Sequence, residues 1–152
     1  KPMARGKSRS ERRKESSEQI REQIRLHADE INRLRAQTVA YCAPVRGRQR
    51  LSQDELREVW LTYDRCYDAL AFPGGWEGAT CRLLAGDPEC MEAAICFLEV
   101  RPYFYHSGYM FNSLLRKAKR APLDPEQLER LGRVLDKLAQ WKLVRLRKQA
   151  RD

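Results

Sequence analysis

Residues 11–42 contain neither glycine nor proline, and this uninterrupted stretch constrains the fold more than any other feature of the sequence. Along it, mostly apolar side chains recur at alternating steps of four and three residues, at Ile20, Ile24, His27, Ile31, Leu34, Thr38 and Tyr41. This spacing keeps them on one face of a helix, while charged residues cover the rest. The stretch therefore predicts one amphipathic helix of roughly 30 residues and about 45 Å, which Pro44 and Gly47 end.

Two uses of this apolar face are open. His27 and Thr38 interrupt the seam that a coiled coil requires, so we expect the helix to pack on the protein's own body. Self-association is the alternative, and the residues that would form such a homodimer are Ile20, Ile24, Ile31, Leu34 and Tyr41.

The remaining sequence also has helical periodicity, and no segment alternates convincingly between apolar and polar residues as a strand does. Further helices are expected at residues 53–71, 76–85, 88–100, 109–120 and from 125 onward, with basic residues 142–151 fraying. Ser52, with Glu55 three residues later, and the pairs Asp87-Pro88 and Asp124-Pro125 are helix starts. Helix 88–100 is apolar nearly all round, which predicts the central, most buried helix.

The expected fold class is therefore all-α, with five or six helices: a long N-terminal amphipathic helix and stacked helical hairpins. Residues 1–10 are small, basic and without periodicity, so we expect a disordered tail there. Residues 11–43 are the long helix, and residues 44–152 are a helical core that ends in a basic helix.

Charge is divided unevenly along the chain, whose net charge is +9. Residues 1–50 carry 14 Lys/Arg against 6 Asp/Glu, which gives +8. Residues 51–112 sum to −6 and residues 113–152 to +7. The basic ends are expected either to attract a polyanion or to fold back on the acidic middle. No apolar run approaches the roughly 18 residues that span a bilayer, so a membrane span is not expected.

The segment from Phe97 to Tyr109, an apolar helix followed by Arg101-Pro102, the aromatic turn Tyr103-Phe104-Tyr105 and a Ser-Gly-Tyr helix start, resembles a known pattern. It is similar to a stretch in uncharacterised bacterial proteins with HEAT-like helical hairpins. The resemblance covers about residues 87–138. It implies a scaffold-type helical fold and carries no known active site.

Catalytic chemistry finds little support in the sequence. Two histidines, His27 and His106, accompany five cysteines that lack the CxxC spacing of zinc or redox motifs. An enzyme that pairs Cys81, Cys90 or Cys96 with His106 is a minor alternative. His106 is expected to cap the following helix or bond a carbonyl. No enzyme activity, cofactor or metal is therefore expected, and the odd number of cysteines suits reduced thiols in a cytoplasmic protein.

Basic clusters and exposed aromatic side chains are the better candidates for function, because cations contact phosphates and basic amphipathic helices enter acidic grooves. The candidate basic residues are Arg9, Arg12, Arg13, Lys14, Arg116, Lys117, Lys119, Arg120, Lys142, Arg145, Arg147 and Lys148. The candidate aromatic residues are Tyr103, Phe104, Tyr105 and Trp141. The favoured interpretation is a non-enzymatic helical scaffold or adaptor that docks on a protein partner. The alternative is an accessory protein that binds nucleic acid without sequence preference through its basic ends.

Overall fold

The computed structural model describes residues 5–152, which form six α-helices joined by turns and loops. Their bounds are α1 Arg9–Cys42, α2 Gln53–Ala71, α3 Ala79–Leu84, α4 Pro88–Val100, α5 Ser107–Ala118 and α6 Pro125–Arg151. Residues 5–152 contain no β-strand, so the predicted all-α class with a long N-terminal helix is confirmed. No helix in this range is both long enough and apolar enough to cross a bilayer.

The first helix begins earlier than its apolar pattern indicated. Ser8 caps it, because the Ser8 side chain accepts a hydrogen bond from the Glu11 N–H at 3.2 Å and the Glu11 carboxylate accepts one from the Ser8 N–H. This reciprocal capping box satisfies two N–H groups and starts the helix at Arg9 rather than at residue 11. Residues 9 and 10 are therefore helical, whereas residues 1–4 of the expected tail lie outside the described part of the chain.

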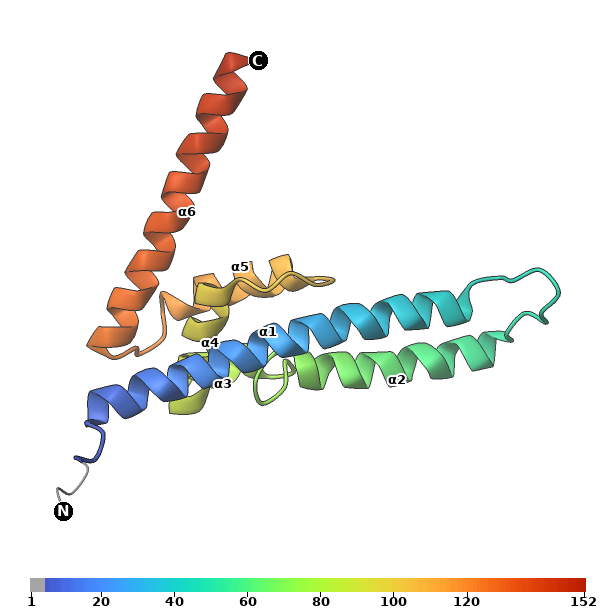
Figure 1. Cartoon of the computed structure of the whole chain (residues 1–152), viewed down its shortest axis with the longest axis horizontal. Coiled ribbons are helices and arrows are strands. Elements are labelled where there is room, and N and C mark those ends of the chain that lie inside the picture. The colour runs from blue at the N-terminus through green and yellow to red at the C-terminus, as the bar shows by residue number, and fades with distance from the viewer. Residues whose placement is uncertain (1–4) are drawn as a thin grey trace.

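α1 and α2 run antiparallel as a long hairpin (Figure 1), and α4 also packs against α1. The apolar stripe of α1 packs inward: Ile24 and Ile31 are buried in the core, and Ile20 packs against it. Leu34 is half-buried and Tyr41 is exposed. The stripe therefore packs on the protein's own body, and Ile24 and Ile31 are not free to form the homodimer that the sequence left open.

The centre of the molecule is α4, which contacts α1, α3, α5 and α6. Residues 93–98 are six consecutive buried residues, so both faces of this helix are covered. Helices that are apolar all round need neighbours on every side, and α4 has them. The prediction that this segment forms the most buried helix is confirmed.

The glycine-rich turn before α3 shortens that helix from the predicted 76–85 to Ala79–Leu84. The Trp76 and Glu77 N–H groups bond back to the carbonyl and the carboxylate of Asp68, which keeps this segment out of the helix. Gly78 then stands at the N-cap with a φ of 74°, in the left-handed region that glycine tolerates without strain. α4 and α6 begin as predicted, with Asp87 and Asp124 as N-caps.

The last helix leaves the body of the protein at a steep angle and ends far from it (Figure 1). Gln127, Arg130, Leu131 and Val134 are buried against the other helices. Every residue from 139 to 152 is exposed, although the helix continues to Arg151 rather than fraying at residue 142. Residues 139–151 are called the α6 arm below.

Candidate binding surfaces

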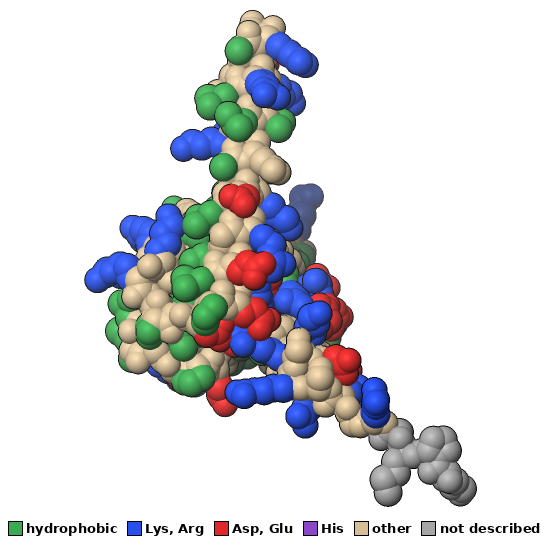
Figure 2. All heavy atoms as spheres, turned by 90° about the vertical axis from the view of Figure 1, so that its left-hand side faces the viewer, with side chains coloured by type: hydrophobic (Ala, Val, Ile, Leu, Met, Phe, Trp, Pro, Cys, Tyr) green, Lys and Arg blue, Asp and Glu red, His purple; other side chains and the backbone are tan. Residues whose placement is uncertain are grey.

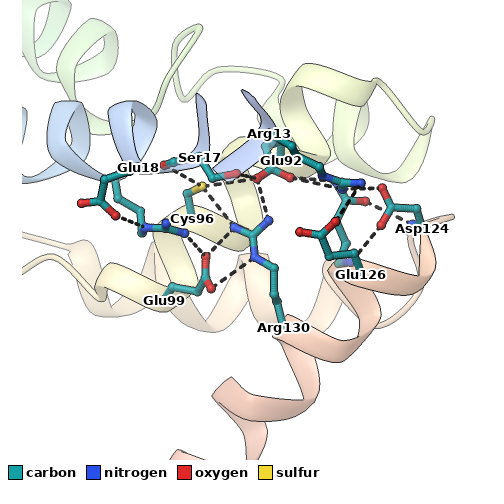
Figure 3. A network of polar contacts seen from close by, with 11 residues as sticks. Arg13, Ser17, Glu18, Glu92, Cys96, Glu99, Asp124, Glu126 and Arg130 are labelled. Carbon is teal, nitrogen blue, oxygen red and sulfur yellow. Dashed lines mark hydrogen bonds and ion pairs between the residues drawn. The ribbon is translucent and has the colours of Figure 1, made fainter. Parts of the chain in front are cut away.

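A buried arginine fixes the first half of α6 to the central helix (Figure 3). The Arg130 side chain is only 7% exposed, and its two terminal nitrogens each lie 2.6 Å from a carboxylate oxygen, one of Glu92 and one of Glu99. The Arg130 Nε–H also donates to Glu99 at 3.2 Å. Since Glu92 and Glu99 are seven residues apart, they stand on one face of α4 and close on the guanidinium from both sides.

α1 joins the same network from the opposite side. The Ser17 hydroxyl donates to Glu92 at 2.6 Å, and Arg21 donates to Glu99 at 3.1 Å. Near the N-terminal ends of α1 and α6, Arg13 pairs with Asp124 at 2.6 Å and with Glu126 at 3.2 Å. This network therefore holds α1, α4 and α6 together through charge-assisted hydrogen bonds, which are stronger than hydrogen bonds between neutral groups.

The network keeps its charges near neutral pH. Burial alone would raise the pKa of Glu92, but hydrogen bonds from Gln127, Ser17 and Arg130, together with the Arg130 charge, lower it to about 2. Burial and the negative charge of Glu92 raise the pKa of the neighbouring Cys96 thiol to about 11. A thiol of this kind holds little of the thiolate that a nucleophile requires. The network is therefore best understood as the attachment of α6.

The cysteine and histidine residues of the minor enzyme hypothesis are not linked by hydrogen bonds in the described chain. Burial raises the pKa of the Cys90 thiol, which donates to the Ala79 carbonyl at 3.2 Å. His106 occupies the N-cap position of α5 with a φ of 66°. Within the described residues its side chain makes neither a capping hydrogen bond nor one to a carbonyl, so neither alternative of that prediction is met. Residues 5–152 also hold no cluster of three or more side chains able to bind a metal ion.

The α6 arm presents apolar and basic side chains together. Figure 2 shows these two kinds of side chain along the projecting helix, with acidic side chains only toward its base. The large apolar residues and their exposed fractions are Trp141 66%, Leu143 55%, Val144 64% and Leu146 56%. The cations are Lys142, Arg145, Arg147, Lys148 and Arg151, and none of them forms an ion pair within residues 5–152.

The arm meets the body at a small groove next to Trp141. The Arg101 guanidinium lies 5.4 Å from the Trp141 ring centroid and 5.1 Å from that of Phe111. Leu98, Val134 and Leu138 also line this groove, whose volume is about 300 Å³. Trp141 is therefore the last arm residue for which a contact with the body is evident.

A second surface lies where the turn between α4 and α5 meets α1. Its hollow of about 680 Å³ is lined by Asn32, Arg35, Tyr103, Phe104, Tyr105, His106, Ser107, Gly108, Tyr109 and Asn112 and is called the tyrosine hollow. The Arg35 guanidinium lies 3.5 Å above the Tyr105 ring, and the His106 ring follows at 3.9 Å between centroids. Tyr103 and Tyr109 are 91% and 76% exposed. Phe104, by contrast, is buried in the core and is not a surface aromatic.

Hydrogen bonds from α1 and α2 hold the turn between α4 and α5. The Asn32 amide donates to the Tyr103 carbonyl at 3.0 Å, and the Tyr67 hydroxyl donates to the Tyr105 carbonyl at 2.8 Å. Arg101 and His106 have φ values of 50° and 66°, which are uncommon for residues other than glycine. Tyr103 and Tyr105 are therefore presented by a fixed turn rather than by a loose loop, and Tyr109 by the first turn of α5.

The remaining basic candidates do not form one surface. Arg9, Arg12 and Lys14 are exposed on the first turns of α1, but Arg13 is partly covered by its ion pairs. Because Arg13 binds Asp124 at the start of α6, the arm begins about 22 Å further along that helix. Arg116, Lys119 and Arg120 are exposed and Lys117 is half-buried near the end of α5. The carboxylates of α2 form no ion pair with either basic end in the described chain.

Sequence reasoning missed the attachment of α6 and the role of Arg130. A signal was present, because beyond Glu89 in its first turn helix α4 contains only two charged residues, Glu92 and Glu99, and Gln127 and Arg130 lie beside the apolar face of the last helix. Paired polar residues on faces that must be buried predict a buried polar contact. No family model, no curated protein and no solved structure matches this chain.

Proposed function

We propose that this chain is a non-enzymatic helical interaction module, a scaffold or adaptor, that docks on a protein partner through the α6 arm. The observation that carries the proposal is the exposure of Trp141, Leu143, Val144 and Leu146 on a helix that projects from the body. Large apolar side chains gathered on one exposed element are typical of protein interaction sites. The five unpaired cysteines suit the reducing cytoplasm, which we include in the proposal.

The chemistry of the arm indicates what such a partner presents. Leu143, Val144 and Leu146 gain little from a phosphate backbone, whereas an apolar groove in a protein would bury them. The cations around them favour acidic residues at the edges of that groove. Because five positive charges repel a second copy of the same arm, an acidic partner is favoured over a homodimer.

The experiment is affinity capture with the full chain under near-native conditions, with nuclease added, compared with capture by the triple variant Leu143→Ser, Val144→Ser and Leu146→Ser. This variant keeps every cation of the arm. The wild-type chain should recover one dominant acidic protein, and the triple variant should lose it. Equal recovery by both chains would contradict docking through the arm.

A sequence-nonspecific nucleic-acid-binding accessory protein is the second candidate function. It is favoured by the cations of the arm and of the α5 end, which form no ion pairs within the described residues. Binding of a random oligonucleotide should then weaken steeply as salt rises, since each phosphate contact releases a counterion. Joint substitution of Arg116, Lys117, Lys119 and Arg120 by glutamine should weaken binding of all sequences equally. An affinity that does not fall with salt would exclude the phosphate mechanism.

A further inference from the structure

We propose that the tyrosine hollow is a nucleotide-binding site, in which a base stacks on the exposed tyrosines and a phosphate binds Arg35 and the start of α5. The ligand chemistry is that of a nucleotide unit, either free or within a single strand. The site uses none of the α6 arm, so the inference is independent of the function proposed above.

The aromatic side chains carry the first part of the inference. The ring centroids of Tyr105 and His106 lie 3.9 Å apart at an interplanar angle of 73°, and those of His106 and Tyr109 lie 5.3 Å apart at 40°. The Arg35 guanidinium lies 3.5 Å from the Tyr105 ring centroid. Tyr109 and Tyr103 keep most of their surface in solvent, 76% and 91%. Flat aromatic faces held on a fixed turn are the platforms on which bases stack in proteins that bind single strands.

The positive groups of the hollow carry the second part. The Arg35 guanidinium and the first residues of α5 line the hollow, and none of the described residues that line it is a carboxylate. The first N–H groups of a helix lack intrahelical partners and favour an anion. In α5 the Ser107 N–H already donates to the Phe104 carbonyl at 2.9 Å, so the Gly108 and Tyr109 N–H groups are the ones offered to a phosphate. Gly108 stands among them, and apart from its chain neighbours and the backbone of its own helix no atom lies within 4 Å of the position where its Cβ would be, so a phosphate has space to approach the backbone.

The side-chain amides of Asn32 and Asn112 provide hydrogen-bonding groups that suit the edge of a base. The Asn32 amide nitrogen donates to the Tyr103 carbonyl, which leaves its oxygen available as an acceptor. The exposed Asn112 amide makes no hydrogen bond to the rest of the described chain and offers both a donor and an acceptor. Side-chain amides and aromatic rings together recognise unstacked bases in many single-strand-binding proteins.

An adjoining hollow extends the aromatic surface beside the tyrosine hollow. It has a volume of about 390 Å³, shares Arg35, Tyr105 and His106 with the tyrosine hollow, and is also lined by Trp60, Tyr63, Asp64 and Tyr67. The Tyr63 hydroxyl is buried and has no hydrogen-bond partner within the described residues. Because this hydroxyl is closed to solvent, we assign it no ligand, and the adjoining hollow contributes aromatic side chains to the site.

The test is a set of NMR titrations of the labelled full-length chain with adenosine monophosphate, adenosine, inorganic phosphate and a ten-nucleotide mixed-sequence single-stranded RNA. The variants are Tyr109→Ala, Asn112→Ala and Arg35→Gln. The matched control is Tyr41→Ala, because Tyr41 is also exposed beside an arginine, Arg48, whose guanidinium lies 5.8 Å from the Tyr41 ring centroid.

The monophosphate should shift the amide signals of residues 103–112 and bind more tightly than adenosine or phosphate alone. Tyr109→Ala should weaken its binding roughly 10-fold, and Arg35→Gln should abolish its advantage over adenosine. Tyr41→Ala should bind as the wild type does. RNA that binds more tightly than the monophosphate identifies a strand as the ligand, and equal affinity identifies a free nucleotide.

Three results would overturn the proposal. One is the absence of shifts in residues 103–112 with both the monophosphate and the RNA at millimolar concentration. Another is RNA binding that Tyr109→Ala and Asn112→Ala leave unchanged, which would assign it to the basic arm. The third is binding of a proline-rich acidic peptide in the hollow while nucleotides fail to bind, which would make it a peptide site. Since Tyr109 and Asn112 are exposed, their variants keep the test decisive even where Arg35→Gln alters the turn.

Discussion

The two halves of α6 form one continuous helix but have opposite environments. In the first half Leu131, Leu135 and Leu138 face the body, and Arg130 is clamped between two carboxylates. At the same helical spacing the second half places Lys142, Arg145 and Gln149 on that face. The helix leaves the body at the point where its inner face changes from leucine to cation. The comparison teaches that side-chain identity along one face, rather than a break in the backbone, decides where this helix stops packing.

The same difference explains why the arm can be helical without touching the body. An isolated helix of about 13 residues is marginal in water, because nucleation is unfavourable. The first half of α6 supplies the nucleus, since its N-terminus has a complete capping box between Asp124 and Gln127 and its inner face is buried. The arm then extends a helix that already exists. Each added residue loses only its own conformational entropy, and no new nucleus has to form.

The largest effect on stability should come from removing Arg130, which is held between Glu92 and Glu99 in what we call the clamp. Arg130→Met removes the nearest cation of Glu92 and Glu99 and leaves them only Arg13 at 4.0 Å and Arg21 at 3.1 Å, so the free energy of unfolding should fall by roughly 3 kcal/mol. Urea unfolding followed by circular dichroism measures this change. In the wild type, the amides of residues 127–138 should exchange with solvent more slowly than those of the arm. In Arg130→Met this difference should disappear.

A matched substitution on the same helix distinguishes the clamp from a general loss of charge. Arg133 pairs only with the exposed Glu129 in the described chain, so Arg133→Met should cost less than about 1 kcal/mol. The triple variant Glu92→Gln, Glu99→Gln and Arg130→Met should recover part of the loss, since it leaves neither carboxylate buried without the Arg130 charge. Equal effects of Arg130→Met and Arg133→Met would show that the clamp does not hold α6.

The second largest effect is expected from acid. The pKa of Glu92 falls from its usual 4.5 to about 2 in the folded chain, so its contribution to stability is complete above the unfolded pKa. That contribution is lost as pH falls from about 4.5 through about 2, and partial solvent screening limits it to on the order of 2 kcal/mol. Urea midpoints measured at several pH values between 7 and 2 test this. Glu92→Gln should be less stable at pH 7 and should show a shallower decline over this interval.

Local signals in the sequence predicted most of the fold. The spacing of Ile24 and Ile31 specified the inner face of α1, and Asp87 and Asp124 specified helix starts, because periodicity and capping act within a few residues. The Arg130 clamp was not predicted, since its partners are 31 and 38 residues away along the chain. Such contacts depend on how helices cross, which the sequence of either helix alone does not determine.

The candidate sites were predictable to a smaller extent. The aromatic segment was found from composition, but its orientation depends on left-handed backbone at Arg101 and His106, a conformation that sequence rules assign to glycine or asparagine. That backbone turns Tyr103 outward and Phe104 into the core. Similarly, the basic character of the last helix was evident, whereas its separation into a docked half and a free arm required the position of α4.

A smaller effect is expected at the boundary between the two halves. Trp141→Ala removes the contact with Arg101, whose guanidinium lies 5.4 Å from the ring centroid, so the loss should be about 0.5–1 kcal/mol. A double-mutant cycle with Arg101→Ala separates this contact from the rest of the indole, and the measured coupling should be of the same size. A coupling near zero would mean that the packed part of α6 ends before residue 141.

The smallest effect on stability should come from deletion of residues 142–152, and this makes it the sharpest test of the contrast. All of these residues are exposed and their cations form no ion pairs in the described chain, so the free energy of unfolding should change by no more than about 0.5 kcal/mol. Urea unfolding of the shortened chain, with the full chain as its control, gives the number. Under the proposed function the same deletion should abolish capture of the partner, because binding and stability are then carried by opposite halves of one helix. A loss of several kcal/mol would instead mean that the arm returns to the body in solution, and its apolar side chains would then be part of the core rather than a surface offered to another protein.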